Sequence, residues 1–209
     1  MAKSSKIVGP FRCVWPYLSE PTGYGDDPNQ KKKYKLTLLI PKSDKAAVKM
    51  MQDFIKARID ENGAWKADQK KAIFNRAMKT VTDEGINNFC LLRDGDKLNE
   101  DRLANDKTPY EFFKDHYVIS LSRPEKFGMP LVVGVDAKEI APAPISNVIR
   151  SGYYVKAEIS AYTYDKPKSG ISLQFTGVQM WKKAEEFGKQ NNFEAGEAEE
   201  ENDESSFED

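Results

Sequence analysis

The feature that most constrains the fold is a long alternating stretch, GYYVKAEISAYTYDKP (152–167). From Val155 to Ala161 every second residue is small or aliphatic, and a β-strand places such residues on one face. A second stretch, GISLQFTGVQMWK (170–182), follows directly after the turn sequence DKPKSG. Together the two stretches predict a long β-hairpin with one apolar face turned toward the interior of a sheet protein.

Further strands are predicted on both sides of a helical segment. FRCVWPYL reads as a strand in which Pro16 marks an edge or a bulge, and FCLLRDGDKL reads as strand-like, with an Asp-Gly turn at Asp94 and Gly95. Between about 43 and 107 apolar residues recur mainly at helical spacing. The predicted strands outside the hairpin are 11–18, 33–41, 116–124 and 130–136.

These elements suit a mainly β protein with a helical insertion, of the α+β class. We expect an OB-fold, a five-stranded closed barrel whose faces and loops bind oligonucleotides. One domain is predicted over 1–185, with its helical insertion at about 43–107, followed by a disordered acidic tail over 186–209. No apolar window reaches the roughly 20 residues that a membrane span needs, and MAKSSKIVGPF at the start lacks the apolar run of a secretory signal.

The net charge of −1 conceals an unequal distribution of charge along the chain. Residues 194–209 contain nine acidic and no basic residues. Removing these nine from the 33 acids leaves 24 against 32 Lys and Arg, so residues 1–193 carry a net charge of +8. A basic body with an acidic tail indicates interaction with a polyanion. The simpler alternative is a solubilising tail on an unrelated domain.

The polar face of the long alternating strand carries three tyrosines, and lysines follow it in the turn. Unpaired bases stack on aromatic rings and lysines neutralise the phosphates between them. Tyrosines also favour strands and pack beneath loops without binding anything. The stacking candidates are Tyr154, Tyr162 and Tyr164. The phosphate-contact candidates are Arg12, Lys31, Lys32, Lys33, Lys35, Arg150, Lys156, Lys166 and Lys168.

The N-terminal strand carries further aromatic residues. We assign Phe11 and Trp15 to the core rather than to a stacking surface. Tyr34 lies within the lysine cluster, and the sequence is equally compatible with a core position and with a position on the stacking surface. We include it among the stacking candidates. Trp181, at the end of the last strand, is ambiguous in the same way.

Signals for catalysis are weak. The sequence has no phosphate-cradling GxxxxGK[ST], no GxSxG and no HExxH. The single histidine, His116, is read as structural, so no cofactor and no metal site is expected. Acids cluster at 94–96 and in three other turns or helix ends, which keeps a metal-dependent nuclease open as an alternative. Cys13 and Cys90 are read as small buried thiols, typical of the reducing cytoplasm.

The long hairpin carries a family resemblance. SGYYVKAEISAYTYD, a Lys/Gly turn and GISLQFTGVQMWKKAE resemble the C-terminal signature of a phage single-stranded DNA-binding protein family, in which a G-x-x-V-x-A strand precedes aromatic-x-Tyr and Gly-Val-Gln. GPFRCVWPYLSEP resembles the N-terminal part of that family. The resemblance covers most of residues 7–183, is specific in the last forty of them and loose in the helical middle.

This resemblance implies an OB-fold that coats single-stranded DNA cooperatively, with little sequence preference, during phage replication or recombination in the host cytoplasm. Proteins of this type end in an acidic tail with a terminal aromatic. Here Phe207 is followed by Glu208 and Asp209 instead of standing last. We expect the tail to compete with DNA for the basic surface and to dock a DNA polymerase or another replication or recombination protein, through Glu199, Glu200, Glu201, Asp203, Glu204 and Phe207.

The leading hypothesis is therefore a non-catalytic single-stranded DNA-binding protein of a phage, without a membrane partner and with self-association along the DNA. An alternative from another class is a replication-protein adaptor, which binds mainly protein partners through its sheet or its tail. Binding to free oligonucleotide separates the two hypotheses.

Overall fold

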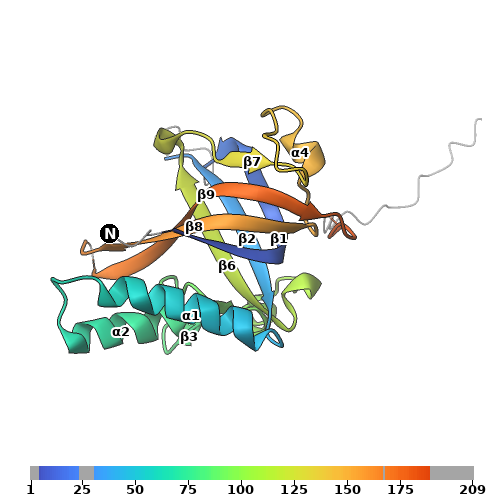
Figure 1. Cartoon of the computed structure of the whole chain (residues 1–209). Coiled ribbons are helices and arrows are strands. Elements are labelled where there is room, and N and C mark those ends of the chain that lie inside the picture. Colours follow the sequence, from blue (N-terminus) through green and yellow to red (C-terminus); the bar gives the residue numbers. More distant parts are fainter. Residues whose placement is uncertain (1–4, 24–30, 167, 189–209) are drawn as a thin grey trace, which may run out of the picture.

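The computed structural model describes residues 5–23, 31–166 and 168–188. In these ranges seven strands form one sheet in the order β5-β6-β2-β1-β8-β9-β7 (Figure 1). All neighbours are antiparallel except β7, which runs parallel to β9. The strands are β1 (Ser5–Thr22), β2 (Lys33–Pro41), β5 (Arg93–Asp94), β6 (His116–Pro124), β7 (Leu131–Val133), β8 (Tyr154–Tyr164) and β9 (Gly170–Lys182).

The predicted helical insertion lies between β2 and β6. It contains α1 (Lys45–Asp60), α2 (Ala67–Met78), the two-stranded pair β3 (Val81–Thr82) and β4 (Gly85–Ile86), α3 (Gly95–Ala104) and the short turn η1 (Glu111–Phe113). The Asp44 side chain caps α1 by accepting a hydrogen bond from the Ala47 amide at 2.9 Å. Figure 1 shows α1 and α2 side by side along one flank of the sheet. Two smaller elements, η2 (Glu125–Phe127) and α4 (Ile145–Val148), connect β6 to β8.

The predicted hairpin is confirmed as β8 and β9. They pair from Tyr154 opposite Lys182 to Tyr164 opposite Gly170. The small and aliphatic residues of β8 are buried, as the alternation predicts: Val155, Ala157, Ile159 and Ala161. They pack against the buried face of α1 and the inner residues of β2 and β6 in one continuous core. Burial of this apolar face holds the helical insertion against the sheet.

The expected fold is a closed barrel of five strands, whereas the sheet in the described residues is open and has seven strands. β6 lies alongside β9, but no hydrogen-bonded ladder joins them in the described ranges, so the sheet is open between β5 and β7. The physical reason is that the free edge of β9 pairs with β7, at Gly177 to Gln179. The architecture is thus α+β, mostly sheet, with the helices in one inserted segment.

The Asp-Gly turn predicted at 94–95 is wrong. The Asp94 carboxylate accepts hydrogen bonds from the amides of Asp96 and Lys97, which makes it the N-cap of α3. At Gly95 a Cβ atom would collide with the backbone carbonyl oxygens of Phe113 and His116. The glycine therefore serves the close packing of α3 against the chain that leads into β6, and β5 is only two residues long.

Both cysteines are buried and unpaired, as predicted. Burial raises the pKa of the Cys13 thiol to about 12, so it stays protonated and inert at neutral pH. His116 begins β6 and its Nδ1 lies 2.6 Å from the Lys114 carbonyl oxygen, a structural contact. In the described part of the chain, no helix has the length and apolar character needed to traverse a bilayer.

Candidate nucleic-acid interface

A groove of about 610 Å³ runs across β1, β2 and β6 on the face opposite the main core. β1 contributes two aromatic rings, β2 two lysines and β5 an arginine. The residues that line the groove are Trp15, Tyr17, Lys33, Lys35, Thr37, Asn88, Cys90, Leu91, Arg93, Ser120, Leu121, Ser122 and Ser172. We refer to this surface as the groove.

An irregularity in β1 turns its aromatic side chains into the groove. The pairing of β1 with β2 shifts register between Val14 and Tyr17, and Trp15 has a φ of 51°. Such a bulge re-aims the side chains that follow it. Trp15 is 36% and Tyr17 47% exposed. The assignment of Trp15 to the core is therefore wrong, and Tyr17 was missed, although Pro16 between them marks the position of the bulge.

The ring of Trp15 is held in place by a cluster of aromatic side chains. Tyr110, Phe112 and Phe113 meet it edge-on, with centroid separations of 5.2, 5.8 and 5.8 Å. The Trp15 amide donates a hydrogen bond to Ser151 Oγ at 3.0 Å. Because a preorganised ring loses little conformational freedom when a ligand binds, this bracing favours stacking.

Three cations border the aromatic pair. The backbone of Lys35 lies opposite Tyr17 in the β1–β2 ladder, and the Lys35 ammonium donates to the Gly23 carbonyl oxygen at 3.3 Å. Lys33 lies two residues away on the same face. Arg93 enters from β5, and its Nε is buried without a hydrogen-bond partner among the described residues. Arg93 thus adds a third cation to the lining of the groove.

The floor of the groove is lined with hydroxyl groups. Thr37 lies opposite Ser120 in the β2–β6 ladder, and Lys35 lies opposite Ser122. Ser172, at the start of β9, completes this floor where β9 passes β6. Hydroxyl groups donate and accept hydrogen bonds with any base edge or phosphate oxygen. The groove therefore combines aromatic faces, cations and adaptable polar groups.

Several predicted contact residues lie elsewhere. Tyr34 is only 7% exposed and packs in the core, so its ring face is not available for stacking. It shares strand parity with Leu36 and Leu38, which also point inward. Lys33 and Lys35 do line the groove. Lys31 and Lys32 precede β2 and are exposed.

Arg12 and Arg150 hold a segment of the protein itself. Arg12 donates to the Gly152 and Glu185 carbonyl oxygens at 2.8 and 2.6 Å, and its guanidinium lies 3.9 Å from the centroid of the Phe187 ring. Arg150 pairs with Glu186 at 2.9 Å. These contacts fix residues 185–187, which we call the strap, against the middle of β1. Both arginines are therefore engaged within the protein rather than in the groove.

The strap also reaches the aromatic cluster. The Phe187 ring stacks on Phe112 with centroids 4.8 Å apart, and Phe112 in turn contacts Trp15. The predicted domain boundary at 185 thus falls just before two residues that pack on the domain. The predicted tail residues Glu199, Glu200, Glu201, Asp203, Glu204 and Phe207 lie outside the described residues.

The predicted face of β8 divides into two parts. Near its start, Tyr154 is half-buried, and the Lys156 ammonium lies 3.5 Å from the centroid of the Trp181 ring. None of these three residues lines the groove. At its end, Tyr162 is 43% exposed and lies opposite the groove residue Ser172 in the ladder. Directly opposed residues share a face, so Tyr162 belongs to the groove side of the sheet.

The hairpin tip carries Tyr164, Lys166 and Lys168, and α1 and α2 hold it in place. Trp65 Nε1 donates to Asp165 Oδ1 at 2.7 Å, and Gln69 Nε2 donates to Ser169 Oγ at 3.1 Å. Tyr164 is half-buried, and burial raises its pKa. Both lysines are exposed. The helices thus present the tip as a basic rim beyond the Ser172 end of the groove.

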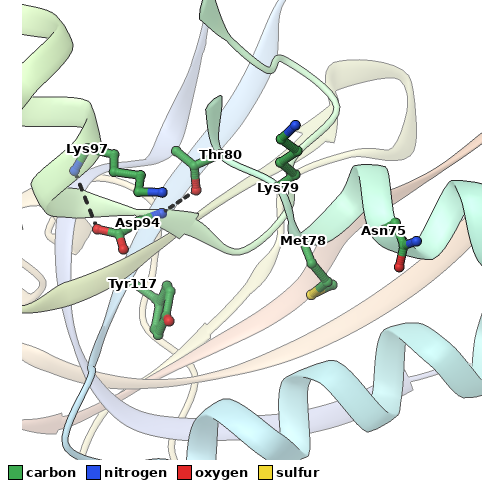
Figure 2. A pocket seen from close by; sticks show the side chains of 7 residues that line it. All are labelled: Asn75, Met78, Lys79, Thr80, Asp94, Lys97 and Tyr117. Atoms are coloured by element: carbon green, nitrogen blue, oxygen red, sulfur yellow. Dashed lines mark hydrogen bonds between the residues drawn. The ribbon is translucent and has the colours of Figure 1, made fainter. Parts of the chain in front are cut away.

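A second hollow, of about 420 Å³, lies between α2, α3 and Tyr117. Figure 2 shows Asp94 bonded to its neighbours there: its amide donates to Thr80 Oγ1 at 2.8 Å, and its carboxylate accepts from the Lys97 amide. The Lys42 ammonium lies 2.6 Å from a carboxylate oxygen of Asp94 and 2.6 Å from one of Asp96. This acid cluster is therefore neutralised by an internal cation. The described residues contain no group of three or more His, Cys, Asp or Glu placed to hold a metal ion.

Comparison with known proteins relates this geometry to a family. The sequence matches the family model described as "Enterobacter phage Enc34, ssDNA-binding protein" over residues 4–207. No curated protein matches the sequence.

Solved structures share the fold. The single-stranded DNA-binding protein from bacteriophage Enc34 in complex with ssDNA is 22% identical, with a TM-score of 0.66 and coverage of 90% of this chain and 91% of that chain. Its C-terminal truncation is 22% identical, with a TM-score of 0.63 and coverage of 89% and 90%. Gp2.5, a single-stranded DNA-binding protein encoded by bacteriophage T7, is 17% identical, with a TM-score of 0.51 and coverage of 92% and 99%.

Proposed function

The chain belongs to the family of the single-stranded DNA-binding protein of Enterobacter phage Enc34, and on this premise we propose that it binds single-stranded DNA, without catalysing a reaction on it, during phage replication or recombination. The observation that supports assigning DNA binding to a particular surface is the composition of the groove. Two exposed rings, Trp15 and Tyr17, stand there beside Lys33, Lys35 and Arg93. This combination of stacking platforms and cations is what an unpaired strand requires.

Bases stack on Trp15 and Tyr17, and each stacked base contributes about 1–3 kcal/mol. Lys33, Lys35 and Arg93 neutralise the phosphates between them. The hydroxyl groups of Thr37, Ser120 and Ser122 can donate hydrogen bonds to a base edge or accept them from it. The groove therefore binds DNA with little sequence preference. Double-stranded DNA binds more weakly there, because paired bases cannot offer their faces to the rings.

The finer fold assignment is an OB-type barrel. The order β2-β1-β8-β9, with β6 beside β2 and also alongside β9, supports it. In this assignment β7 is an added edge strand, and the groove is the face through which OB-folds bind oligonucleotides. The hairpin tip extends this path, with Tyr162 and the rim lysines Lys166 and Lys168 contacting the nucleotides that leave the groove.

The acidic tail competes with DNA for the groove. Residues 194–209 bring nine negative charges and no positive charge. The strap holds the start of the tail beside the aromatic cluster, since Phe187 stacks on Phe112 and Phe112 contacts Trp15. DNA, with its higher charge density, displaces the tail and makes it available to replication proteins.

Titration of fluorescently labelled oligo-dT at several salt concentrations tests the function. Each neutralised phosphate contributes a slope of roughly −0.7 to log K against log salt. Three groove cations therefore give a slope of about −2, and the rim lysines make it steeper. Affinity that does not change with salt would contradict the groove. Absence of binding to free oligo-dT at low salt would favour the adaptor hypothesis.

Removal of residues 194–209 tests the tail. Affinity for oligo-dT should rise several-fold at low salt, and the gain should shrink as salt increases, because the competition is electrostatic. A full-length control in which the nine acids are replaced by Asn and Gln should show the same gain. Unchanged or weaker affinity in both proteins would reject the competing tail.

A further inference from the structure

A second concave surface, on the helical insertion, matches the chemistry of the tail. Between the C-terminal end of α1 and the first turns of α2 lies a slot of about 230 Å³. Ile59, Ala67 and Phe74 give it an apolar floor. Its charged lining residues are Lys56, Lys70, Lys71 and one acid, Asp60, three positive charges against one negative charge. We call it the helix slot. It shares no lining residue with the groove.

The charge around the helix slot favours an acidic occupant. Residues 45–79 contain nine basic and four acidic residues. Lys56 pairs with Asp60 at 2.5 Å, and the Lys70 ammonium donates to the Asp60 carbonyl oxygen at 2.7 Å. Lys71 is exposed and forms no ion pair in the described ranges. An apolar floor with a cationic rim selects an aromatic side chain flanked by carboxylates.

The end of the chain contains that combination. Phe207 stands within three residues of Glu204, Glu208 and Asp209, with no basic residue nearby. The other aromatic beyond the strap, Phe193, has one adjacent acid and follows Lys189 by four positions. Phe207 is therefore the better match to a slot rimmed by lysines.

The fold places the root of the tail far from the helix slot of its own copy. The hairpin tip is bonded to α2 through Gln69 and Ser169. From that tip β9 runs 13 residues toward the strap, which at roughly 3.3 Å per residue is about 40 Å. Figure 1 shows the end of β9 and the α1–α2 connection on opposite sides of the molecule.

We propose that the helix slot binds the Phe207 end of the tail of a second copy, so that neighbouring copies join head to tail. Copies aligned along one DNA strand can repeat this contact between different surfaces, and such a repeated heterologous contact gives an open chain. As a flexible chain, the 19 residues from 189 to 207 have an average end-to-end distance of roughly 25 Å. This is shorter than the distance of about 40 Å along β9 within one copy, so the slot of an adjacent copy that lies nearer is the favoured acceptor. This inference rests on the proposed function in one respect: DNA in the groove displaces the tail and frees it for the neighbour.

Binding of a labelled peptide, residues 189–209, to the full-length protein saturated with a short oligo-dT tests the proposal. Lys70→Glu with Lys71→Glu in the protein should weaken peptide binding at least tenfold. The matched control, Lys45→Glu with Lys49→Glu, makes the same charge change on exposed positions of α1 away from the slot. It should change the affinity for the peptide less than twofold. A Phe207→Ser peptide should bind at least tenfold more weakly than the parent.

Equal weakening by both pairs of substitutions would overturn the proposal, because it would indicate general charge attraction. If the peptide binds the DNA-free protein but does not bind the protein saturated with the short oligonucleotide, the tail binds only in the groove, and this result would also overturn the proposal. Affinity for an oligonucleotide that accommodates one copy should be the same in all variants. This measurement separates failure of the helix slot from failure of the groove. Affinity for long oligo-dT should fall only in the variant with Lys70→Glu and Lys71→Glu.

Discussion

The groove and the start of the β8–β9 hairpin both set a tryptophan beside lysines, but the two tryptophans have different surroundings. On the hairpin, the Lys156 ammonium covers the face of Trp181 at 3.5 Å from the ring centroid. In the groove, three aromatic rings pack against Trp15 at steep angles, and Trp15 lines a hollow together with Lys33 and Arg93. Trp181 already has an internal cation as its partner, whereas we propose that Trp15 receives a base.

This difference teaches that composition alone does not identify a stacking surface. The polar face of β8 carries more tyrosines than any other strand, but Tyr154 lies at one end of it and the paired rings of Tyr162 and Tyr164 at the other. In β1 a single bulge gathers two rings next to the cations of β2 and β5. Local backbone geometry, rather than the number of aromatic residues, decides where an unpaired base finds a platform.

The largest expected effect separates the two tryptophans. Trp15→Ala should weaken oligo-dT binding by roughly 1–3 kcal/mol, about 5- to 150-fold, because a stacking platform is lost. Trp181→Ala, which removes a more exposed tryptophan outside the groove (47% against 36%), should change affinity less than twofold. Fluorescence anisotropy at fixed salt measures both. If Trp181→Ala lost more oligo-dT affinity than Trp15→Ala, the interface would lie on the hairpin face and not in the groove.

The next effect separates the two sets of cations. Arg93→Gln should reduce the steepness of the salt dependence by about 0.7, because one phosphate contact is lost. Lys156→Gln should leave the slope unchanged, since Lys156 lies over Trp181. Titrations at four or more salt concentrations give the slopes. Equal slopes for Arg93→Gln and the parent would remove Arg93 from the interface.

A smaller effect concerns the segment that supplies Arg93. Hydrogen bonding to Lys42 lowers the pKa of Asp96, so this interaction stabilises the fold above the unfolded pKa of Asp and is lost as pH falls through the lower folded value. Burial lowers the pKa of Lys42, but hydrogen bonds to Asp94 and Asp96 outweigh it and raise the pKa. The Lys42 contribution is therefore complete below the unfolded pKa of Lys and is lost as pH rises through the higher folded value.

Lys42→Ala should therefore lower the free energy of unfolding by up to about 1 kcal/mol near neutral pH. The difference from the parent should narrow as pH falls below about 4, where the carboxylates become protonated. Urea denaturation across this pH range measures it. Lys49→Ala, which removes an exposed pair with Asp53 on α1, is the control and should cost less. A pH-independent difference would show that the ion pairs do not cause it.

The smallest effect lies at the groove end of the hairpin. Tyr162→Ala should weaken binding by a few tenths of a kcal/mol, less than a full stacking contribution, because Tyr162 shares the face of Ser172 without lining the groove. Tyr34→Phe should leave affinity unchanged, since Tyr34 is buried. Anisotropy titrations with long and short oligo-dT compare them. If Tyr162→Ala lost as much oligo-dT affinity as Trp15→Ala, the groove and the end of the β8 face would form one continuous interface.

Much of the fold could be predicted from sequence periodicity. The alternation of β8 predicted its buried face, and helical spacing predicted the insertion between β2 and β6. Parity along β2 also contained the information that Tyr34 points inward with Leu36 and Leu38, although the nearby lysines suggested otherwise. These features are local, so a short window of sequence determines them.

The rest of the site depends on contacts between distant segments. The roles of Arg12 and Arg150 follow from the return of the strap to β1, more than 30 residues beyond Arg150, and no local pattern signals it. Arg93 reaches the groove only because β5 pairs with β6. The exposure of Trp15 was foreshadowed by Pro16, but a proline cannot tell by how many residues the register shifts.

The bulge in β1 makes the binding surface more vulnerable to a change in chain length than to many changes of residue type. Deleting Pro16 would restore plain alternation between Val14 and Tyr17 and rotate a ring toward the interior, while every aromatic residue remained in the protein. Homologues that align well by identity around this point but differ by a single gap should therefore differ in which rings they offer to a nucleotide.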